Sequence, residues 1–367
     1  MSVYLACFLA SFLVSLLLMM TKNWHGRLSM DHAVGVQKFH SKPTPRIGGL
    51  GVLAGLLLAY SESPEQVDQI LGPMLLAGVP AFAFGLLEDV TKRVGVLARL
   101  LATMVSGVTA WYLTGVAMQN TGVPALDAML QITALAVLFT AFTVGGVANS
   151  VNIIDGFHGL ASGTVAIMLG AMGLIALQVG DAPLASVSFV VAAAALGFAA
   201  VNWPLGKIFL GDGGAYLLGF LVAWVAILLP MRNPQLTAWT TLLACAYPVI
   251  EVLYSVWRRW RQKASAGAPD NLHLHSLVKT QIVMKHVSHW NPRLRNAAVA
   301  PLVWPYAALP AALAMAWPDA PVWVHLAELI GCVFIYHVFY QRLARQALIA
   351  PAVDIAPAAL SPQNDDR

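Results

Sequence analysis

The sequence predicts an all-α integral membrane protein that crosses the bilayer about eleven times. Hydrophobic residues make up 59% of its 367 residues and charged residues only 10%, whereas soluble domains carry about 25% charge. So few charges could not cover a core of this size, so we expect lipid to cover much of it. Each span needs roughly 20 apolar residues. The expected spans are 3–20, 46–60, 72–87, 97–117, 128–147, 160–178, 184–201, 214–230, 236–256, 297–316 and 322–340.

The basic residues predict how these spans are oriented. All of the 21 Lys and Arg residues except Arg232 belong to the loops after odd-numbered spans or to the C-terminal tail. Because basic loops stay in the cytosol, we expect the N-terminus outside and the C-terminus in the cytosol. We expect one membrane domain, residues 1–346, followed by a disordered cytosolic tail, residues 347–367, which is rich in Ala and Pro.

Charge and cysteine content argue against several classes of protein. The net charge of +4 is spread over cytosolic loops, where anionic lipid headgroups would attract it, so nucleic-acid binding is not expected. The three cysteines all fall inside apolar spans. They give neither a disulfide framework nor the spacing of metal ligands. The first span lacks a basic start and a small-residue cleavage site, so we expect an uncleaved helix.

Two acidic motifs lie in the cytosolic loops. Glu88 and Asp89 close the third span. They could bind Mg²⁺ or take a proton from an attacking group, or they could be solvated charges beside Lys92 and Arg93. Asp212 stands among glycines just before an apolar helix. It could simply cap that helix, but the free N–H groups there would also attract phosphate.

A third motif combines amides, a carboxylate and glycines. Asn149, Asn152 and Asp155 are spaced by three residues, and Gly156 and Gly159 follow them. On a helix the three polar side chains would share one face. In a loop the glycines would let backbone N–H groups approach a ligand. A helix cap needs only one such residue, so this motif predicts a site for a diphosphate or a nucleobase.

Basic and histidine side chains near these motifs could contact phosphate. Arg46 follows the stiff turn 43–45 and could pair with a phosphate, or it could be an ordinary orienting arginine. His273 and His275 lie in the longest cytosolic loop. No further ligands stand near them, so we reject a zinc site and expect contacts with phosphate or sugar. Further candidates are Lys42, Asn202 and Lys207.

In this order and on these loops, the motifs resemble those of the polyprenyl-phosphate N-acetylhexosamine-1-phosphate transferases. That superfamily includes the bacterial enzymes that start O-antigen, enterobacterial common antigen and teichoic acid synthesis, and the phospho-MurNAc-pentapeptide translocases. The similarity covers roughly residues 38–300 and includes the Pro-Thr-Pro-Arg-x-Gly-Gly signature at residues 43–49. It implies ten or eleven helices and a site at the cytosolic face of a bacterial plasma (inner) membrane.

The resemblance also implies a reaction. Polyprenyl phosphate, expected to be undecaprenyl phosphate, would attack the β-phosphate of a UDP-N-acetylhexosamine and release UMP, to start an O-antigen-like surface polysaccharide. Glu88, Asp89 and Asp212 would be catalytic, with Mg²⁺ or Mn²⁺ on Asp212 and Asp89. The substrate-binding residues would be Lys42, Arg46, Asn149, Asn152, Asp155, Gly156, His158, Asn202, Lys207, His273 and His275. A homodimer is an open alternative to a monomer.

The chain departs from the superfamily pattern in places, and alternatives stay open. Glu88 stands where most members have Asp, and His158 where many have Asp or Asn, which leaves the sugar undecided. Leu274 separates the two histidines, which argues against the phospho-MurNAc-pentapeptide transferase alternative. A transporter or flippase would place ionisable groups near the membrane midplane. Glu251 and Glu328 are the only acidic residues expected within spans.

Overall fold

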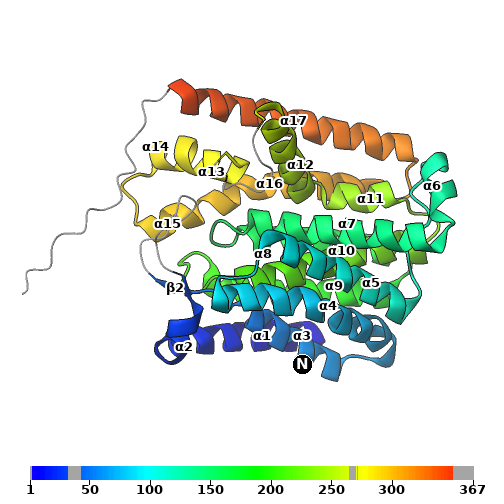
Figure 1. Cartoon of the computed structure of the whole chain (residues 1–367), viewed down its shortest axis with the longest axis horizontal. Helices are drawn as coiled ribbons and strands as arrows, with labels where there is room; N and C mark the ends of the chain where they lie inside the picture. Colours follow the sequence, from blue (N-terminus) through cyan, green and yellow to red (C-terminus); the bar gives the residue numbers. More distant parts are fainter. Residues whose placement is uncertain (1, 32–42, 264–269, 271, 350–367) are drawn as a thin grey trace, which may run out of the picture.

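The computed structural model describes residues 2–31, 43–263, 270 and 272–349, which form a helical bundle. Figure 1 shows the long helices, most of which lie side by side along the longest axis while α12 runs steeply across it. These helices are α1 (Val3–Met20), α3 (Gly49–Glu62), α4 (Glu65–Thr91), α5 (Val96–Thr114), α7 (Thr133–Ile154), α8 (Leu160–Gln178), α9 (Ala182–Asn202), α10 (Gly211–Arg232), α12 (Ala246–Arg261), α16 (Val299–Ala316) and α17 (Val322–Ile349).

Short elements connect the long helices. Strands β1 and β2 pair antiparallel, with Met30 opposite Pro45, and hold the chain that leads into α3. The short elements are α2 (Lys22–Ser29), β1 (Met30–Asp31), β2 (Thr44–Pro45), α6 (Pro124–Leu130), α11 (Ala238–Ala244), α13 (Leu274–Val278), the π-helix Lys279–Val283, α14 (Met284–His286) and α15 (Pro292–Ala297).

The prediction of an all-α, multi-pass membrane protein is confirmed. Nine of the described helices are long and apolar enough to cross a membrane. The expected span 236–256 is instead broken into α11 and α12, which meet at 83° and would make a tenth span. Pro248 favours this break, because a proline offers no N–H to the carbonyl four residues earlier. That residue is Ala244, the last residue of α11.

Other boundaries also differ from the expectation. The expected span 46–60 corresponds to α3, which has only 14 residues and is about 21 Å long at 1.5 Å per residue. It is too short by itself for a hydrocarbon core of roughly 30 Å, so it is not counted among the nine. The expected span 72–87 is longer than predicted, because α4 covers Glu65–Thr91. Helix α17 continues to Ile349, and the remainder of the predicted tail, 350–367, lies outside the described residues.

Helix α10 is the centre of the bundle, because most of its residues are buried and α3, α4, α7 and α8 pack against it. Glycines allow two of these helices to approach its first turn. A Cβ on Gly49 would lie 2.4 Å from the backbone nitrogen of Gly214, and a Cβ on Gly85 would lie 2.6 Å from the Asp212 carbonyl. A larger side chain at Gly49 or Gly85 would therefore push α3 or α4 away from the start of α10.

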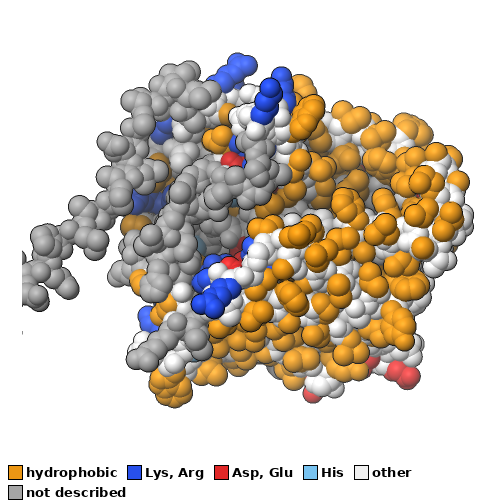
Figure 2. Space-filling model, in the orientation of Figure 1, with side chains coloured by type: hydrophobic (Ala, Val, Ile, Leu, Met, Phe, Trp, Pro, Cys, Tyr) orange, Lys and Arg blue, Asp and Glu red, His pale blue; other side chains and the backbone are white. Residues whose placement is uncertain are grey.

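The surface divides into a charged end and an apolar body. Figure 2 shows Lys and Arg side chains gathered at one end of the bundle, on the left, while hydrophobic side chains cover most of the remaining visible face. Large side chains such as Leu138 and Phe142 are 59% and 67% exposed on that body. An apolar surface of this extent requires a covering partner, and for a multi-pass membrane protein that partner is lipid.

Candidate functional site

Asp212 opens α10, and side chains from three other segments converge on its carboxylate. Arg46 donates to Oδ1 at 2.8 Å and Asn152 donates to the same oxygen at 3.3 Å. Arg99 donates to Oδ2. Arg46 precedes α3, Arg99 lies in the first turn of α5, and Asn152 lies in the last turn of α7. The structure therefore brings residues from four distant parts of the sequence together at the start of α10.

Asp89 fixes the start of α10, because its carboxylate caps that helix. The backbone N–H groups of Asp212 and Gly213 donate to its two oxygens, each at 2.9 Å. The Arg46 guanidinium lies 3.4 Å from Oδ1, so it pairs with both acids. Asp89 is only 1% exposed. A carboxylate at a helix N-terminus satisfies free N–H groups and is favoured by the helix dipole.

Gly211 gives the chain the conformation that this contact requires. Its φ is +76°, a left-handed value that glycine adopts without the penalty a side chain would bring. A Cβ on Gly211 would lie 2.0 Å from the Arg46 carbonyl oxygen and 2.5 Å from Oδ2 of Asp89. The glycine before Asp212 is therefore required by close packing around the acid.

Glu88 points away from this cluster and stabilises the turn between α4 and α5. Its Oε2 accepts the backbone N–H of Val94 at 2.7 Å. Lys92 closes the same turn by donating to the backbone carbonyl of Asp89 at 2.7 Å. The two neighbouring acids thus make different contacts, one with the turn and one with the start of α10.

The motif at residues 149–159 ends α7 and lies next to the cluster. Asn149 accepts a hydrogen bond from the Tyr216 hydroxyl at 3.3 Å. Asp155 follows the last residue of α7, and within the described residues its carboxylate has no hydrogen-bond partner. Burial raises the pKa of Asp155 to about 8, although the nearby Arg46 charge lowers it. Among the described residues, Asp155 is therefore a carboxyl group without a hydrogen-bond partner. It lies near Arg46, which already pairs with Asp89 and Asp212.

His158 and Asn202 are engaged inside the protein. His158 is 5% exposed, and its Nδ1 lies 3.3 Å from the Pro204 carbonyl oxygen. Asn202 accepts the N–H of Gly159 at 2.6 Å and donates to the Ile208 carbonyl at 2.7 Å. Both polar ends of the Asn202 side chain therefore join the loop after α7 to the loop before α10. The predicted contacts of these two residues with substrate stay predictions.

The histidine loop reaches the motif at residues 149–159 through His275. A Cβ on Gly156 would lie 3.3 Å from its Nε2, and its ring lies edge-on to Phe157 with centroids 5.7 Å apart. His273 stacks on His275 with centroids 5.3 Å apart. Burial lowers the pKa of His275 to about 4, so this imidazole is neutral at physiological pH and donates from one ring nitrogen while it accepts at the other.

The sequence interpretation missed Arg99 as a site residue and treated it only as an orienting charge. The signal was present, because Arg99 is the single charged residue within the apolar run 97–117, and charges inside spans are costly and functional. Lys207 is exposed in the loop before α10 and makes no hydrogen bond or ion pair with the cluster among the described residues. Lys42 lies outside the described residues.

The acids of this cluster fit a magnesium ion only in part. Among the described residues, no three His, Cys, Asp or Glu side chains are grouped to hold a metal. Mg²⁺ needs fewer, because one or two carboxylates commonly hold it together with substrate phosphates. Asp212 fits this role if a phosphate draws one arginine away, and Asp155 is a second acid without a hydrogen-bond partner in the described part of the chain. Asp89 fits less well, since both its oxygens accept N–H groups.

A family comparison matches the part of the chain that carries most of this site. Residues 71–230 match Glycosyl transferase family 4. This stretch contains Asp89, Arg99, Asn152 and Asp212 and ends within α10. Arg46 and the histidine loop lie on either side of it.

Curated relatives are similar over a longer stretch. A probable undecaprenyl-phosphate N-acetylglucosaminyl 1-phosphate transferase of Bacillus subtilis is 28% identical over 244 residues, 65% of this chain and 66% of that protein. The undecaprenyl-phosphate alpha-N-acetylglucosaminyl 1-phosphate transferase of Yersinia pestis is 27% identical over 247 residues, 66% and 67% of the two chains. A decaprenyl-phosphate N-acetylglucosaminephosphotransferase of Mycobacterium leprae is 31% identical over 270 residues, 64% and 66%. The chain thus spans about two thirds of the length of these relatives.

Proposed function

This chain belongs to the polyprenyl-phosphate hexosamine-1-phosphate transferase superfamily, and we propose that it transfers N-acetylglucosamine 1-phosphate from UDP-N-acetylglucosamine to a polyprenyl phosphate. UMP is the second product. The choice of sugar rests on the names of the relatives, which are N-acetylglucosamine-phosphate transferases for both undecaprenyl and decaprenyl phosphate. The same names favour this reaction over phospho-MurNAc-pentapeptide transfer and over a transporter or flippase.

The observation that carries the proposal is the pairing of two arginines with Asp212 at the N-terminus of α10. Arg46 and Arg99 have guanidinium groups that suit the oxygens of a diphosphate. Arg99 is also only partly used, because its buried Nε has no hydrogen-bond partner among the described residues. A diphosphate entering here would exchange the Asp212 carboxylate for its own oxygens as the partner of these arginines.

In the proposed reaction, an oxygen of the polyprenyl phosphate forms a bond to the β-phosphorus of the donor. The bond between that phosphorus and the oxygen bridging to the α-phosphate breaks, and UMP leaves with the electron pair. A phosphate monoester has a second pKa near 6 and is largely ionised at pH 7, so little proton removal is needed. Positioning and charge neutralisation would then supply most of the catalysis.

The residues of the chain divide this work between them. Arg46 and Arg99 hold the phosphates, and Asn152 and Asp155 bind the nucleotide-sugar at the end of α7. Asp89 fixes the start of α10 and, through Arg46, the geometry of the cluster. Asp212 would hold Mg²⁺ or Mn²⁺, which would supply further neutralisation of the diphosphate when bound. His273 and His275 would contact the phosphates or the sugar.

We place this site at the cytosolic face of a bacterial plasma membrane. Support comes from the uneven distribution of charge, since every Lys and Arg except Arg232 is assigned to one side by the sequence. UDP-sugars and UMP are charged, water-soluble molecules, so the site must open to an aqueous compartment that contains them. The product, a polyprenyl-diphospho-sugar, would start the synthesis of a surface polysaccharide.

A phosphate-tracing experiment tests the proposed reaction. Purified protein in detergent is mixed with undecaprenyl phosphate, Mg²⁺ and UDP-N-acetylglucosamine that carries radioactive phosphorus in the β-position. We expect the label to move into the lipid fraction and not to do so with EDTA or without the lipid. Label that stays entirely in water-soluble products, while labelled sugar enters the lipid, would indicate transfer of the sugar alone and contradict the proposal.

A further inference from the structure

Glu251 is a buried carboxylate of α12 that none of the proposed catalytic steps uses. It is 1% exposed in the broken helix pair that makes up a possible membrane span. Placing an ionised carboxylate in such a position is costly unless hydrogen bonds compensate for the lost water. The contacts of Glu251 must therefore offset the cost of burying its carboxylate.

The two hydrogen bonds that Oε1 of Glu251 makes lead to the histidine loop. Glu251 Oε1 accepts the backbone N–H of Leu274 at 2.9 Å and lies 3.1 Å from His273 Nδ1. These two donors flank the start of α13, the short helix that carries His275. One oxygen of a single side chain thus fixes both the backbone and the first imidazole of the loop.

A second helix anchors the same loop from its other side. The Tyr340 hydroxyl of α17 donates to the Leu272 carbonyl at 2.9 Å. Two residues earlier, Asp270 accepts a hydrogen bond from Ser255 of α12 at 2.9 Å and forms an ion pair with Arg258. Residues 270, 272 and 274 are therefore fixed to α12 and α17, and Glu251 is the anchor directly next to the histidines.

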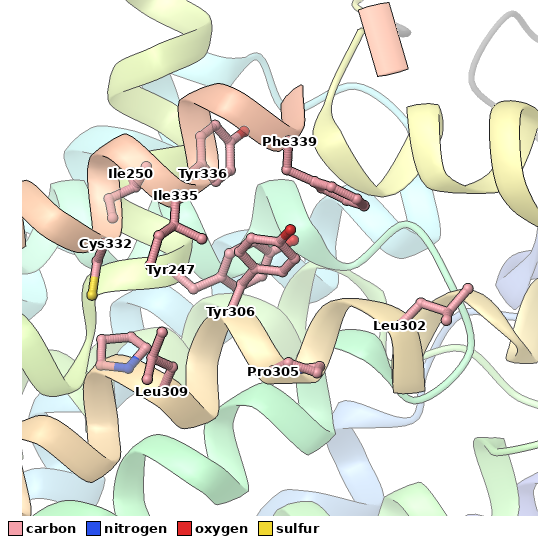
Figure 3. A pocket seen from close by; sticks show the side chains of 11 residues that line it. Tyr247, Ile250, Leu302, Pro305, Tyr306, Leu309, Cys332, Ile335, Tyr336 and Phe339 are labelled. Carbon is pink, nitrogen blue, oxygen red and sulfur yellow. The ribbon is translucent and has the colours of Figure 1, made fainter. Parts of the chain in front are cut away.

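Glu251 also stands at the border between the histidine loop and an apolar pocket. Tyr247, one turn earlier on α12, and Ile250, the preceding residue, line a pocket of about 400 Å³ together with Tyr306 and Tyr336. Figure 3 shows these side chains between α12, α16 and α17. Within the described residues, Oε2 of Glu251 has no hydrogen-bond partner. Oε1, the oxygen that faces the histidine loop, is thus the one that forms hydrogen bonds.

From these contacts we infer that Glu251 is a positioning residue for the donor site. It holds His273 and the start of α13 so that His275 stays against Gly156 and Phe157. It does not touch the reacting atoms. This inference rests on the proposed function, because the importance of the histidine position depends on nucleotide-sugar binding beside the motif at residues 149–159.

The test compares Glu251→Ala with Glu251→Gln. Gln keeps an acceptor oxygen for Leu274 and His273, whereas Ala removes it. Hydrogen bonds to a charged group contribute about 1.5–3 kcal/mol, and 1.4 kcal/mol is a factor of ten. We expect Glu251→Ala to raise the KM for UDP-N-acetylglucosamine about tenfold or more with kcat changed less than about threefold. Glu251→Gln should restore KM to within about threefold of wild type.

The chain offers a matched control in Glu328, which pairs with His325 at 3.0 Å within α17. Glu328→Ala also removes a carboxylate from an imidazole inside a span, but within the described part of the chain Glu328 makes no hydrogen bond or ion pair to a motif loop. Its KM should equal that of the wild type. A Glu328→Ala variant as impaired as Glu251→Ala would show a general packing defect and overturn the inference.

Hydrogen–deuterium exchange of the peptide 272–278 tests the anchoring without any donor. Glu251→Ala should speed exchange there, and Glu251→Gln and Glu328→Ala should not. Unchanged exchange in Glu251→Ala would overturn the inference, as would equal KM values for that variant and the wild type. If the wild-type protein released no UMP from any donor, the proposed function would fail, while the exchange result would still decide whether Glu251 anchors the loop.

Discussion

The carboxylate of Asp89 accepts the backbone N–H of Asp212 at 2.9 Å, so one acid of the site caps the helix on which the other acid stands. Asp89 is enclosed and turned toward the backbone of α10. Asp212 is turned toward Arg46, Arg99 and Asn152. The contacts thus divide between the two acids: Asp89 caps the start of α10, and Asp212 pairs with the arginines and the amide around it.

This division predicts that Asp89→Asn and Asp212→Asn lose activity for different reasons. At position 89 the amide nitrogen would face an N–H donor and leave it unsatisfied, which costs about 1–3 kcal/mol. At position 212 an asparagine still accepts from one arginine. We expect both variants to lose at least about 100-fold in kcat, with the thermal midpoint clearly lowered only in Asp89→Asn. Equal midpoints for the two variants would contradict the capping role of Asp89.

Replacing Arg99 should weaken donor binding. The guanidinium lies at the start of α10 with an unpartnered Nε among the described residues, ready for a phosphate oxygen. Loss of one such charge-assisted contact costs about 1.5–3 kcal/mol. We expect Arg99→Ala to raise the dissociation constant for UDP-N-acetylglucosamine at least about tenfold by calorimetry, and Arg99→Lys to raise it less. Undiminished binding by Arg99→Ala would rule out this contact.

Asn202 should contribute to the stability of the fold, whereas Lys207 should not. Asn202 is 5% exposed, and its side-chain oxygen and nitrogen both form hydrogen bonds with backbone groups. Asn202→Ala leaves these buried backbone groups unpaired and should therefore lower the free energy of unfolding by about 1–3 kcal/mol. Lys207 is exposed, so Lys207→Ala should leave the thermal midpoint unchanged. Differential scanning fluorimetry in detergent measures both. A lower midpoint for Lys207→Ala than for Asn202→Ala would reverse this assignment.

The contribution of His158 to stability should fall as the pH is lowered from 7 to 5. Burial lowers the pKa of His158 to about 4, whereas an unfolded histidine has a pKa near 6.5. Between these two pKa values the unfolded chain binds more protons at this residue than the folded chain does. The contribution of His158 to the free energy of unfolding is therefore fully present above about pH 6.5. It falls below that pH by at most about 1.4 kcal/mol per pH unit. His158→Gln should show a smaller drop in thermal midpoint between pH 7 and pH 5. The exposed His289 provides the control His289→Gln, whose drop should match the wild type.

The helical fold was largely predictable because hydropathy and charge act over local stretches of sequence. Long apolar runs such as 160–178 coincide with helix α8, Leu160–Gln178. The break between α11 and α12 was not predicted, although Pro248 lies at the right place. Proline alone does not decide the matter, because Pro73 and Pro80 lie inside the continuous helix α4. Whether a proline breaks a helix depends on neighbours that the sequence does not display.

The acids and amides of the site were predictable from their spacing, but their partners were not. Arg99 and Asp212 are 113 residues apart, and only the packing of α5 and α10 brings them together. The capping of α10 by Asp89 depends on Gly85 and Gly211, which allow backbones to approach closely. The sequence predicts that His158 contacts the nucleotide or sugar, which stays a prediction, but it does not predict that its Nδ1 lies against the Pro204 carbonyl in the loop before α10. Such long-range contacts follow from tertiary packing alone.

The most direct test of the central claim is UMP release by the purified chain and by its Asp212→Asn variant. Each is assayed with undecaprenyl phosphate, UDP-N-acetylglucosamine and Mg²⁺ in detergent, after the two proteins are shown to have the same thermal midpoint. We predict lipid-dependent and Mg²⁺-dependent UMP release by the wild type and a loss of at least about 100-fold in the variant. UMP release by Asp212→Asn at the wild-type rate would contradict the claim that the start of α10 is the catalytic centre.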